Sequence, residues 1–161
     1  MEKVENQNAK EWKSLTQDGY SITFPDNWTL DLSGKSGTSF LLFAPKAGAS
    51  VGFKSNINMI KRDLGDDRIT LDIYAKGAEE QIQKSNPEKI VVNSGGSANG
   101  KDYHKIIYMA KKKGLDLVFH QQFWVEDGTS YVLTMTALAD EYSRFKDDVN
   151  KIMDGFQVVG D

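Results

Sequence analysis

The chain has 161 residues, of which 39% are hydrophobic and 27% charged, and its formal net charge at pH 7 is -3. A chain of this length buries one hydrophobic core and is short for two ordinary domains. The negative charge offers no cationic field to a nucleic-acid backbone. No apolar run exceeds residues 40–44, far below the roughly 20 residues of a membrane-spanning helix. We therefore expect one soluble domain without a nucleic-acid partner and without membrane insertion.

The sequence contains no cysteine, which excludes disulfides, thiolate metal sites and a cysteine nucleophile. The first eleven residues are polar and lack the apolar segment of a signal peptide, although a signal peptide removed upstream of them stays an alternative. We interpret residues 1–13 as a flexible leader and residues 14–159 as a single α+β domain.

Alternation of apolar and polar residues predicts strands in the first part of the chain. They are expected at 20–24, 28–32, 38–44 and 51–60, with turns at 25–27 and 45–48 and a loop at 33–37. A polar connection over 63–68 leads to an amphipathic helix that begins after the N-cap Thr70 and ends before Asn86-Pro87. A second amphipathic helix is expected after the N-cap Asp140, with an apolar stripe that extends to Phe156.

Turn chemistry predicts the register of four strands between these helices. Asn99-Gly100 is typical of a two-residue type I′ turn and would set Val92 opposite Ile107 and Ile90 opposite Met109. Three-residue loops that end at Gly114 and Gly128 would continue the alignment, and one apolar face then extends over all four strands. In this register that face pairs Met109 with Leu117, Ile107 with Phe119, Tyr103 with Phe123, Phe123 with Tyr131, Phe119 with Met135 and Leu117 with Ala137.

The opposite face of these strands is mixed in character, and its apolar members Ile106, Val118 and Val132 indicate that a helix or the N-terminal strands partly cover it. The fold class that follows is α+β, as an α/β/α sandwich in which two amphipathic helices flank a central antiparallel meander sheet.

Polar and aromatic side chains on this second face form the candidate ligand-binding site. A few polar groups among aromatic rings are typical of a small-ligand pocket, and burial beneath a helix is the alternative interpretation, which we favour. His104 and His120 would be diagonal neighbours that a metal could bridge with Asp102, but without a fixed carboxylate spacing hydrogen-bonded sheet residues are favoured, and we predict no metal and no cofactor. The candidate residues are His104, Tyr108, His120, Gln122, Trp124 and Thr134.

No catalytic grouping is present in the sequence. Ser94-Gly95-Gly96-Ser97 lacks the pattern of a nucleophile elbow, and no order of aspartate and histidine supports a triad. The same glycines lack the Gly-Lys-Ser/Thr end of a phosphate-binding loop. We predict no catalytic residue and no enzymatic activity.

The segment Tyr20-Ser-Ile-Thr-Phe-Pro-Asp-Asn-Trp28 resembles the Y-x-I-x-[YF]-P-x-x-W opening of PsbP-like domains. The order of later elements is also similar, from Phe43-Ala44-Pro45 to a terminal helix near Phe156, so that the resemblance covers residues 14–159. It implies the α/β/α sandwich shared by a Ran-binding nuclear-import factor and by uncharacterised bacterial secreted proteins or lipoproteins, and hence an extracytoplasmic location. Understood members act mostly by binding other proteins, and no family binding residue carries over to this sequence.

The leading hypothesis is therefore a non-enzymatic binding or assembly module with an unknown protein partner. The alternative is a small-molecule or metal-binding domain, or a hydrolase, that uses the sheet face around His104 and His120. Burial of these side chains beneath a helix would favour the first hypothesis, and an open cavity would favour the second.

Overall fold

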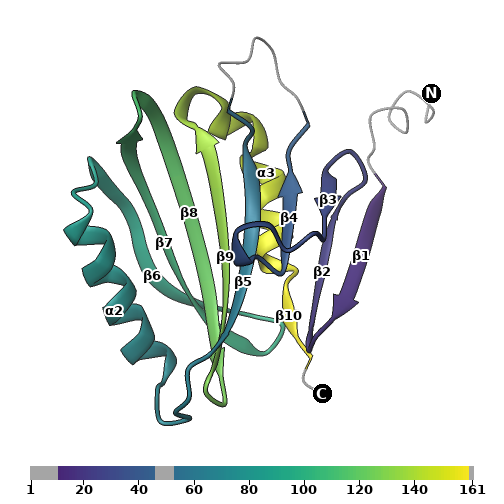
Figure 1. The fold of residues 1–161 in the computed structure, drawn as a ribbon, viewed down its shortest axis with the longest axis vertical. Helices are drawn as coiled ribbons and strands as arrows, with labels where there is room; N and C mark the ends of the chain where they lie inside the picture. Colours follow the sequence, from purple (N-terminus) through teal and green to yellow (C-terminus); the bar gives the residue numbers. More distant parts are fainter. Residues whose placement is uncertain (1–10, 46–52, 160–161) are drawn as a thin grey trace.

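The computed structural model describes residues 11–45 and 53–159, which form two antiparallel sheets and two α-helices (Figure 1). Residues 1–10 of the leader predicted over 1–13, part of the turn at 45–48 and the start of the strand predicted at 51–60 lie outside the described residues. The large sheet has the order β3-β4-β5-β9-β8-β7-β6, and the small sheet has the order β1-β2-β10. The elements are β1 (Trp12–Gln17), β2 (Tyr20–Pro25), β3 (Thr29–Asp31), β4 (Phe40–Phe43), β5 (Asn56–Asp63), α2 (Leu71–Lys84), β6 (Lys89–Ala98), β7 (Lys101–Lys112), β8 (Leu115–Glu126), β9 (Thr129–Leu138), α3 (Ala139–Asp154) and β10 (Gln157–Val158), with a 3-10 turn at Lys35–Gly37.

The two helices cover opposite faces of the large sheet, which confirms the predicted sandwich. Phe123 and Trp124 follow each other in β8 and therefore point to opposite faces. Phe123 packs in the cluster that contains Ala75 and Ile82 of α2, whereas Trp124 belongs to the main core with α3 and the small sheet. Burial in this main core stabilises the fold by about 25 cal/mol per Å² of apolar surface. The core includes Tyr20, Ile22, Phe40, Leu42, Ile57, Met59, Leu133, Met135, Val149, Ile152 and Phe156.

The hairpin between β6 and β7 has the predicted turn. Asn99 and Gly100 both have positive φ, as a type I′ turn requires, and Val92 pairs with Ile107. The register shifts at a bulge between Ile90 and Val92, so that Ile90 lies opposite Tyr108 and not opposite Met109. The prediction for this pair of strands was therefore right near the turn and wrong beyond the bulge.

The predicted three-residue loops of the next two hairpins are wrong. Lys113-Gly114 and Asp127-Gly128 form two-residue turns in which every residue has positive φ. The loss of one loop residue shifts each pairing by one position, and Phe119 lies opposite Tyr108 and Thr136. Because side chains alternate along a strand, β8 is turned over relative to the predicted arrangement.

The helices begin and end close to the predicted positions. The Thr70 hydroxyl accepts a hydrogen bond from the backbone N–H of Ile73 at 3.3 Å, which confirms the predicted N-cap of α2. Helix α3 begins at Ala139 after the N-cap Leu138, so that Asp140 lies in the first turn and is not the cap. Phe156 follows the helix and is buried in the main core.

Two strands were not predicted from the sequence. β1 begins at Trp12, inside the segment interpreted as a leader, and pairs with β2. β10 returns the chain to the other side of β2 directly after α3. No helix within the described residues is long and apolar enough to cross a membrane.

Candidate binding site

The structure places the six predicted site residues on opposite faces of the sheet. Because β8 is turned over, three of them face α3, and the other three, on β7 and β9, face α2. The predicted neighbours His104 and His120 consequently point away from each other, since His104 pairs with Phe123 and His120 pairs with Ile107. The α3 side carries His120, Gln122 and Trp124, and the α2 side carries His104, Tyr108 and Thr134.

On the α3 side, the three predicted residues are completely buried. Trp124 packs against Phe156 with ring centroids 4.7 Å apart. His120 contacts the Tyr142 hydroxyl through Nδ1 at 3.2 Å and the Gln122 Oε1 through Nε2 at 3.3 Å. The Gln122 amide nitrogen in turn donates to Oδ1 of Asp154 at 3.3 Å.

This chain of contacts determines the tautomer of the histidine. The amide nitrogen of Gln122 donates to Asp154, which leaves the Gln122 oxygen as an acceptor. His120 therefore donates through Nε2 and accepts the Tyr142 hydroxyl hydrogen at Nδ1. Each side chain in the chain of contacts has a hydrogen-bond partner, which is the usual condition for polar groups beneath a helix.

Burial keeps His120 neutral. Desolvation lowers the pKa of its imidazole to about 4 from an ordinary value of 6.5, and the positive charge of Lys105 acts in the same direction. The hydrogen bond to Gln122 and the charge of Asp154 oppose this shift and are too weak to reverse it. The imidazole is thus a neutral link between sheet and helix at physiological pH.

On the α2 side, the three predicted residues are half-buried. His104 contacts the Asn93 side-chain oxygen through Nε2 at 2.7 Å, which connects β7 to β6. Tyr108 stacks on Phe119 with centroids 4.9 Å apart, and burial raises the pKa of its hydroxyl. Thr134 accepts a hydrogen bond from the Gln121 amide at 3.3 Å.

The six residues therefore do not line one pocket, and the predicted pairing of the two histidines at a shared site is wrong. Within the described part of the chain, no group of three or more His, Cys, Asp or Glu side chains is arranged to hold a metal ion. Ligand binding by any one of the six residues stays a prediction.

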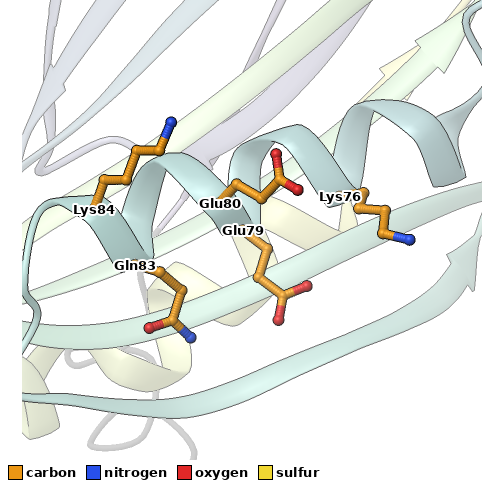
Figure 2. Close-up of a pocket in the computed structure, with 5 residues that line it drawn as sticks. All are labelled: Lys76, Glu79, Glu80, Gln83 and Lys84. Atoms are coloured by element: carbon orange, nitrogen blue, oxygen red, sulfur yellow. The ribbon is translucent and has the colours of Figure 1, made fainter.

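A hollow on the outer surface of α2 is lined by residues of that helix alone: Lys76, Glu79, Glu80, Gln83 and Lys84. Figure 2 shows that their side chains point apart, with Glu80 and Lys84 on one side of the helix and Glu79 and Gln83 on the other. Because a binding site needs polar groups that converge, we interpret this hollow as a solvated helix face.

A groove of about 310 Å³ lies between α3 and the β6-β7 pair. Its floor is made by alternate residues of β7, namely Tyr103, Lys105 and Ile107, together with Val92 and Ser94 of β6. Its α3 wall is made by residues at helical spacing, and Val91 and Gly95 complete the rim. The wall residues are Tyr142, Lys146 and Asn150.

The side chains that line the groove include two lysines, Lys105 and Lys146, and no carboxylate. Among the described residues, neither lysine forms an ion pair, whereas Lys61, Lys101 and Lys111 each pair with a carboxylate. The Lys105 ammonium lies 5.9 Å from the centroid of the Tyr103 ring. The groove is therefore a local positive region on a chain whose net charge is -3.

The outer side of the groove is an edge of the large sheet. β6 has ten residues and, among the described strands, pairs with β7 alone. Most of its residues are exposed, and Val91 retains 53% of its accessible surface. No charged side chain occurs between Ile90 and Ala98. β6 therefore presents a long, uncharged row of backbone donors and acceptors beside the groove.

The sequence interpretation missed this groove. One signal was present in the sequence. Lys105 lies between Tyr103 and Ile107 on the same face of a strand, where an apolar residue is expected and a charged one indicates a special environment. The second signal, the spacing of Tyr142, Lys146 and Asn150 along a helix, becomes informative once α3 is known to lie beside β7. The incorrect register concealed that proximity.

The two antiparallel sheets, the helix on each face of the larger one and the connectivity together define the PsbP/Mog1 fold. The solution structure of cyanobacterial PsbP (CyanoP) from Synechocystis sp. PCC 6803 superimposes with a TM-score of 0.65 at 13% identity, covering 94% of each chain. This result confirms the fold that the Tyr20–Trp28 resemblance implied.

Two further solved structures are similar to this chain over nearly its whole length. LpqN, which is involved in cell envelope biogenesis of Mycobacterium tuberculosis, matches with a TM-score of 0.64 at 17% identity, covering 99% of this chain and 96% of that one. A mutant of the protein Mog1 matches with a TM-score of 0.58 at 12% identity, covering 93% and 97%. No family model and no curated protein matches the sequence.

Proposed function

We propose that this chain is a non-enzymatic binding module that takes an extended segment of a partner protein along the edge strand β6. The fold is one often used for binding or assembly. The observation that carries the proposal is the ten-residue length of β6 together with its lack of charge after Lys89. An extended peptide added to such an edge gains backbone hydrogen bonds along its whole length.

The other sheet edges are less suited to this role. β3 has three residues and β10 has two, which gives each of them few free backbone groups. β1 has six residues, and Lys13 lies within it, where a charge on an edge strand opposes pairing with another chain. β6 has a bulge near Val91, but its run from Val92 to Ala98 pairs regularly with β7. The free edge of this run is the contact surface that we propose.

Photo-crosslinking tests the proposed surface. A photoreactive phenylalanine analogue at Ser97, exposed on β6, is compared with the same analogue at Lys76, exposed on α2, in an extract of the source organism. We expect a covalent adduct with one protein at position 97 and not at position 76. That protein is then identified by mass spectrometry and purified for binding measurements.

The decisive measurement is the Kd of the purified partner. Ser97→Lys adds a charge to the edge on the face away from the groove, and we expect it to weaken binding by at least about tenfold, because a charge on an edge strand opposes strand addition. Glu79→Lys on α2 is the control and should leave the Kd within about twofold. An unchanged Kd for the β6 variant, or the lack of an adduct at position 97, overturns the proposal.

An extracytoplasmic location stays part of this proposal. It is supported by the fold shared with LpqN, a protein involved in cell envelope biogenesis. Fractionation of the source organism with an antibody against this chain tests it, and recovery of the chain with cytosolic markers alone would contradict it.

A further inference from the structure

The groove beside β6 offers a specificity site to any strand that docks on that edge. Neighbouring strands lie about 4.8 Å apart, so a strand added outside β6 would be about 10 Å from β7. Alternate side chains of the added strand would point to the same side of the sheet as Ser94 and Lys105, which are cross-strand partners. A side chain of glutamate length, together with the long side chain of a lysine, covers this distance.

The charges in the groove indicate which side chain it accepts. Lys105 belongs to the β7 floor of the groove and Lys146 to its α3 wall, and no carboxylate lines the groove. Burial, and after it the charge of Asp154, raises the pKa of the floor residue Tyr103, so this carboxylate lies within electrostatic range of the floor. Asp154 already accepts a hydrogen bond from the Gln122 amide. Among the described residues, neither the Lys105 nor the Lys146 ammonium forms an ion pair with a carboxylate.

Uncharged donors accompany the two lysines. Ser94 and Asn150 line the same groove, and the hydroxyl of one and the amide of the other can each donate a hydrogen bond. Hydrogen bonds between charged donors and a carboxylate are about twice as strong as neutral ones. The aromatic Tyr103 at one end of the floor and Ile107 at the other limit the polar part of the groove to its centre.

We propose that this groove binds an aspartate or glutamate side chain of the extended partner segment, held between Lys105 and Lys146. The inference rests on the proposed docking of that segment along β6 and adds the chemistry of its recognition. The partner segment then contains one acidic residue at a fixed place within an uncharged or apolar β-forming sequence. Its neighbours at alternate positions would contact Val92 and Ile107.

Selection from a peptide library tests the inference even while the partner is unidentified. Random 12-residue peptides displayed on phage are selected on the purified chain, and their recovery is compared with that on Lys105→Gln/Lys146→Gln. We expect peptides with one acidic position to be enriched on the wild type and lost on the double variant. The control variant Lys76→Gln/Lys84→Gln on α2 removes the same amount of positive charge and should still bind the enriched peptides.

Calorimetry then measures one enriched peptide and its glutamate-to-glutamine form. We expect the neutral form to bind at least about tenfold more weakly to the wild type and equally to the Lys105→Gln/Lys146→Gln variant. If the double variant loses its thermal unfolding transition, Lys146→Gln alone replaces it, because Lys146 is exposed. Equal binding of both peptide forms to the wild type overturns the inference.

The outcomes separate this inference from the proposed function. Peptides that lose binding to Ser97→Lys but show no acidic preference would overturn the acidic site and leave docking on β6 in place. A library that yields no peptide sensitive to the β6 variant would overturn both. Peptides lost equally on the α2 control variant would show a general charge effect and would overturn the acidic site.

Discussion

The phenol ring of Tyr103 covers the backbone of Gly96, its cross-strand partner on β6. A methyl group added at Gly96 would lie 2.6 Å from the ring carbon Cζ, well inside contact distance. The same ring also packs against Trp124, with centroids 5.8 Å apart. An aromatic side chain that covers a strand glycine shields the backbone from water and holds an edge strand in register.

We predict that Gly96→Ala destabilises the protein. The added methyl group displaces the Tyr103 ring and its contact with Trp124, and overpacking of this kind costs about 1–3 kcal/mol. The measurement is the free energy of unfolding from urea denaturation. The double variant Gly96→Ala/Tyr103→Ala should lose less than the sum of the single variants, and strict additivity would contradict the contact.

Gly95 provides the matched control. The nearest neighbour of a methyl group at this position would be the backbone carbonyl oxygen of Tyr103 at 3.6 Å, which is an ordinary van der Waals contact. Gly95→Ala also reduces the entropy of the unfolded chain, so its effect should lie between zero and a gain of about 1 kcal/mol. A loss equal to that of Gly96→Ala would show that the two glycines share a backbone requirement.

A second prediction concerns the pH dependence of stability. His120 is neutral in the native state down to a pKa of about 4, whereas in the unfolded chain it takes up a proton near 6.5. Between these values the unfolded chain binds more protons, so stability falls as the pH is lowered, by about 1.4 kcal/mol per pH unit at most. Above pH 6.5 this contribution fades as the imidazole of the unfolded chain loses its proton. Urea denaturation at pH 7.5 and 5.0 measures the difference.

His120→Gln should remove this part of the pH dependence, whatever its effect on stability at pH 7.5. Tyr142→Phe serves as the control, since it removes the hydroxyl that donates to Nδ1 and leaves the imidazole buried. It should cost about 0.5–1.5 kcal/mol at both pH values and retain the slope. If NMR shows that the imidazole of His120 itself titrates near pH 6.5 in the folded wild type, the prediction is contradicted.

The sequence predicted those parts of the fold that local chemistry determines. The period of α2, its N-cap Thr70 and the Asn99-Gly100 turn depend on neighbouring residues, and the structure agrees with each. Strand β10 has two residues and exists because α3 delivers it to β2, so no local pattern identifies it. The bulge at Val91 likewise depends on the pairing of β6 with β7.

The predicted placement of the six site residues on one face was wrong for a different physical reason. A loop shorter by one residue reverses the facing of a whole strand, so the error at Gly114 moved His120 and Trp124 to the other face. Apolar side chains did not reveal the error, because both faces of this sheet are covered by helices and both are partly apolar. The buried chain from Tyr142 to Asp154 could not be inferred without this facing.

The turn at Lys113 leads to a third prediction. Lys113 has φ 51°, a left-handed conformation that asparagine adopts more easily than lysine. We expect Lys113→Asn to raise the free energy of unfolding by up to about 1 kcal/mol. Lys112→Asn is the control, because Lys112 is a strand residue paired with Leu115 and should gain nothing. Equal effects of the two substitutions in urea denaturation would contradict the assigned turn.

The last prediction concerns the packing of α3, which forms one wall of the groove. Ile152 is completely buried between the helix and the sheets, and Ile152→Ala should cost about 2–5 kcal/mol through lost burial and the cavity that remains. Ile73→Ala on α2 removes the same atoms from a side chain that is 58% exposed, and it should cost less than about 1 kcal/mol. Both values come from urea denaturation at pH 7.5. Similar losses for the two variants would mean that α3 is not packed on the sheet as described, and the groove would then lack its wall.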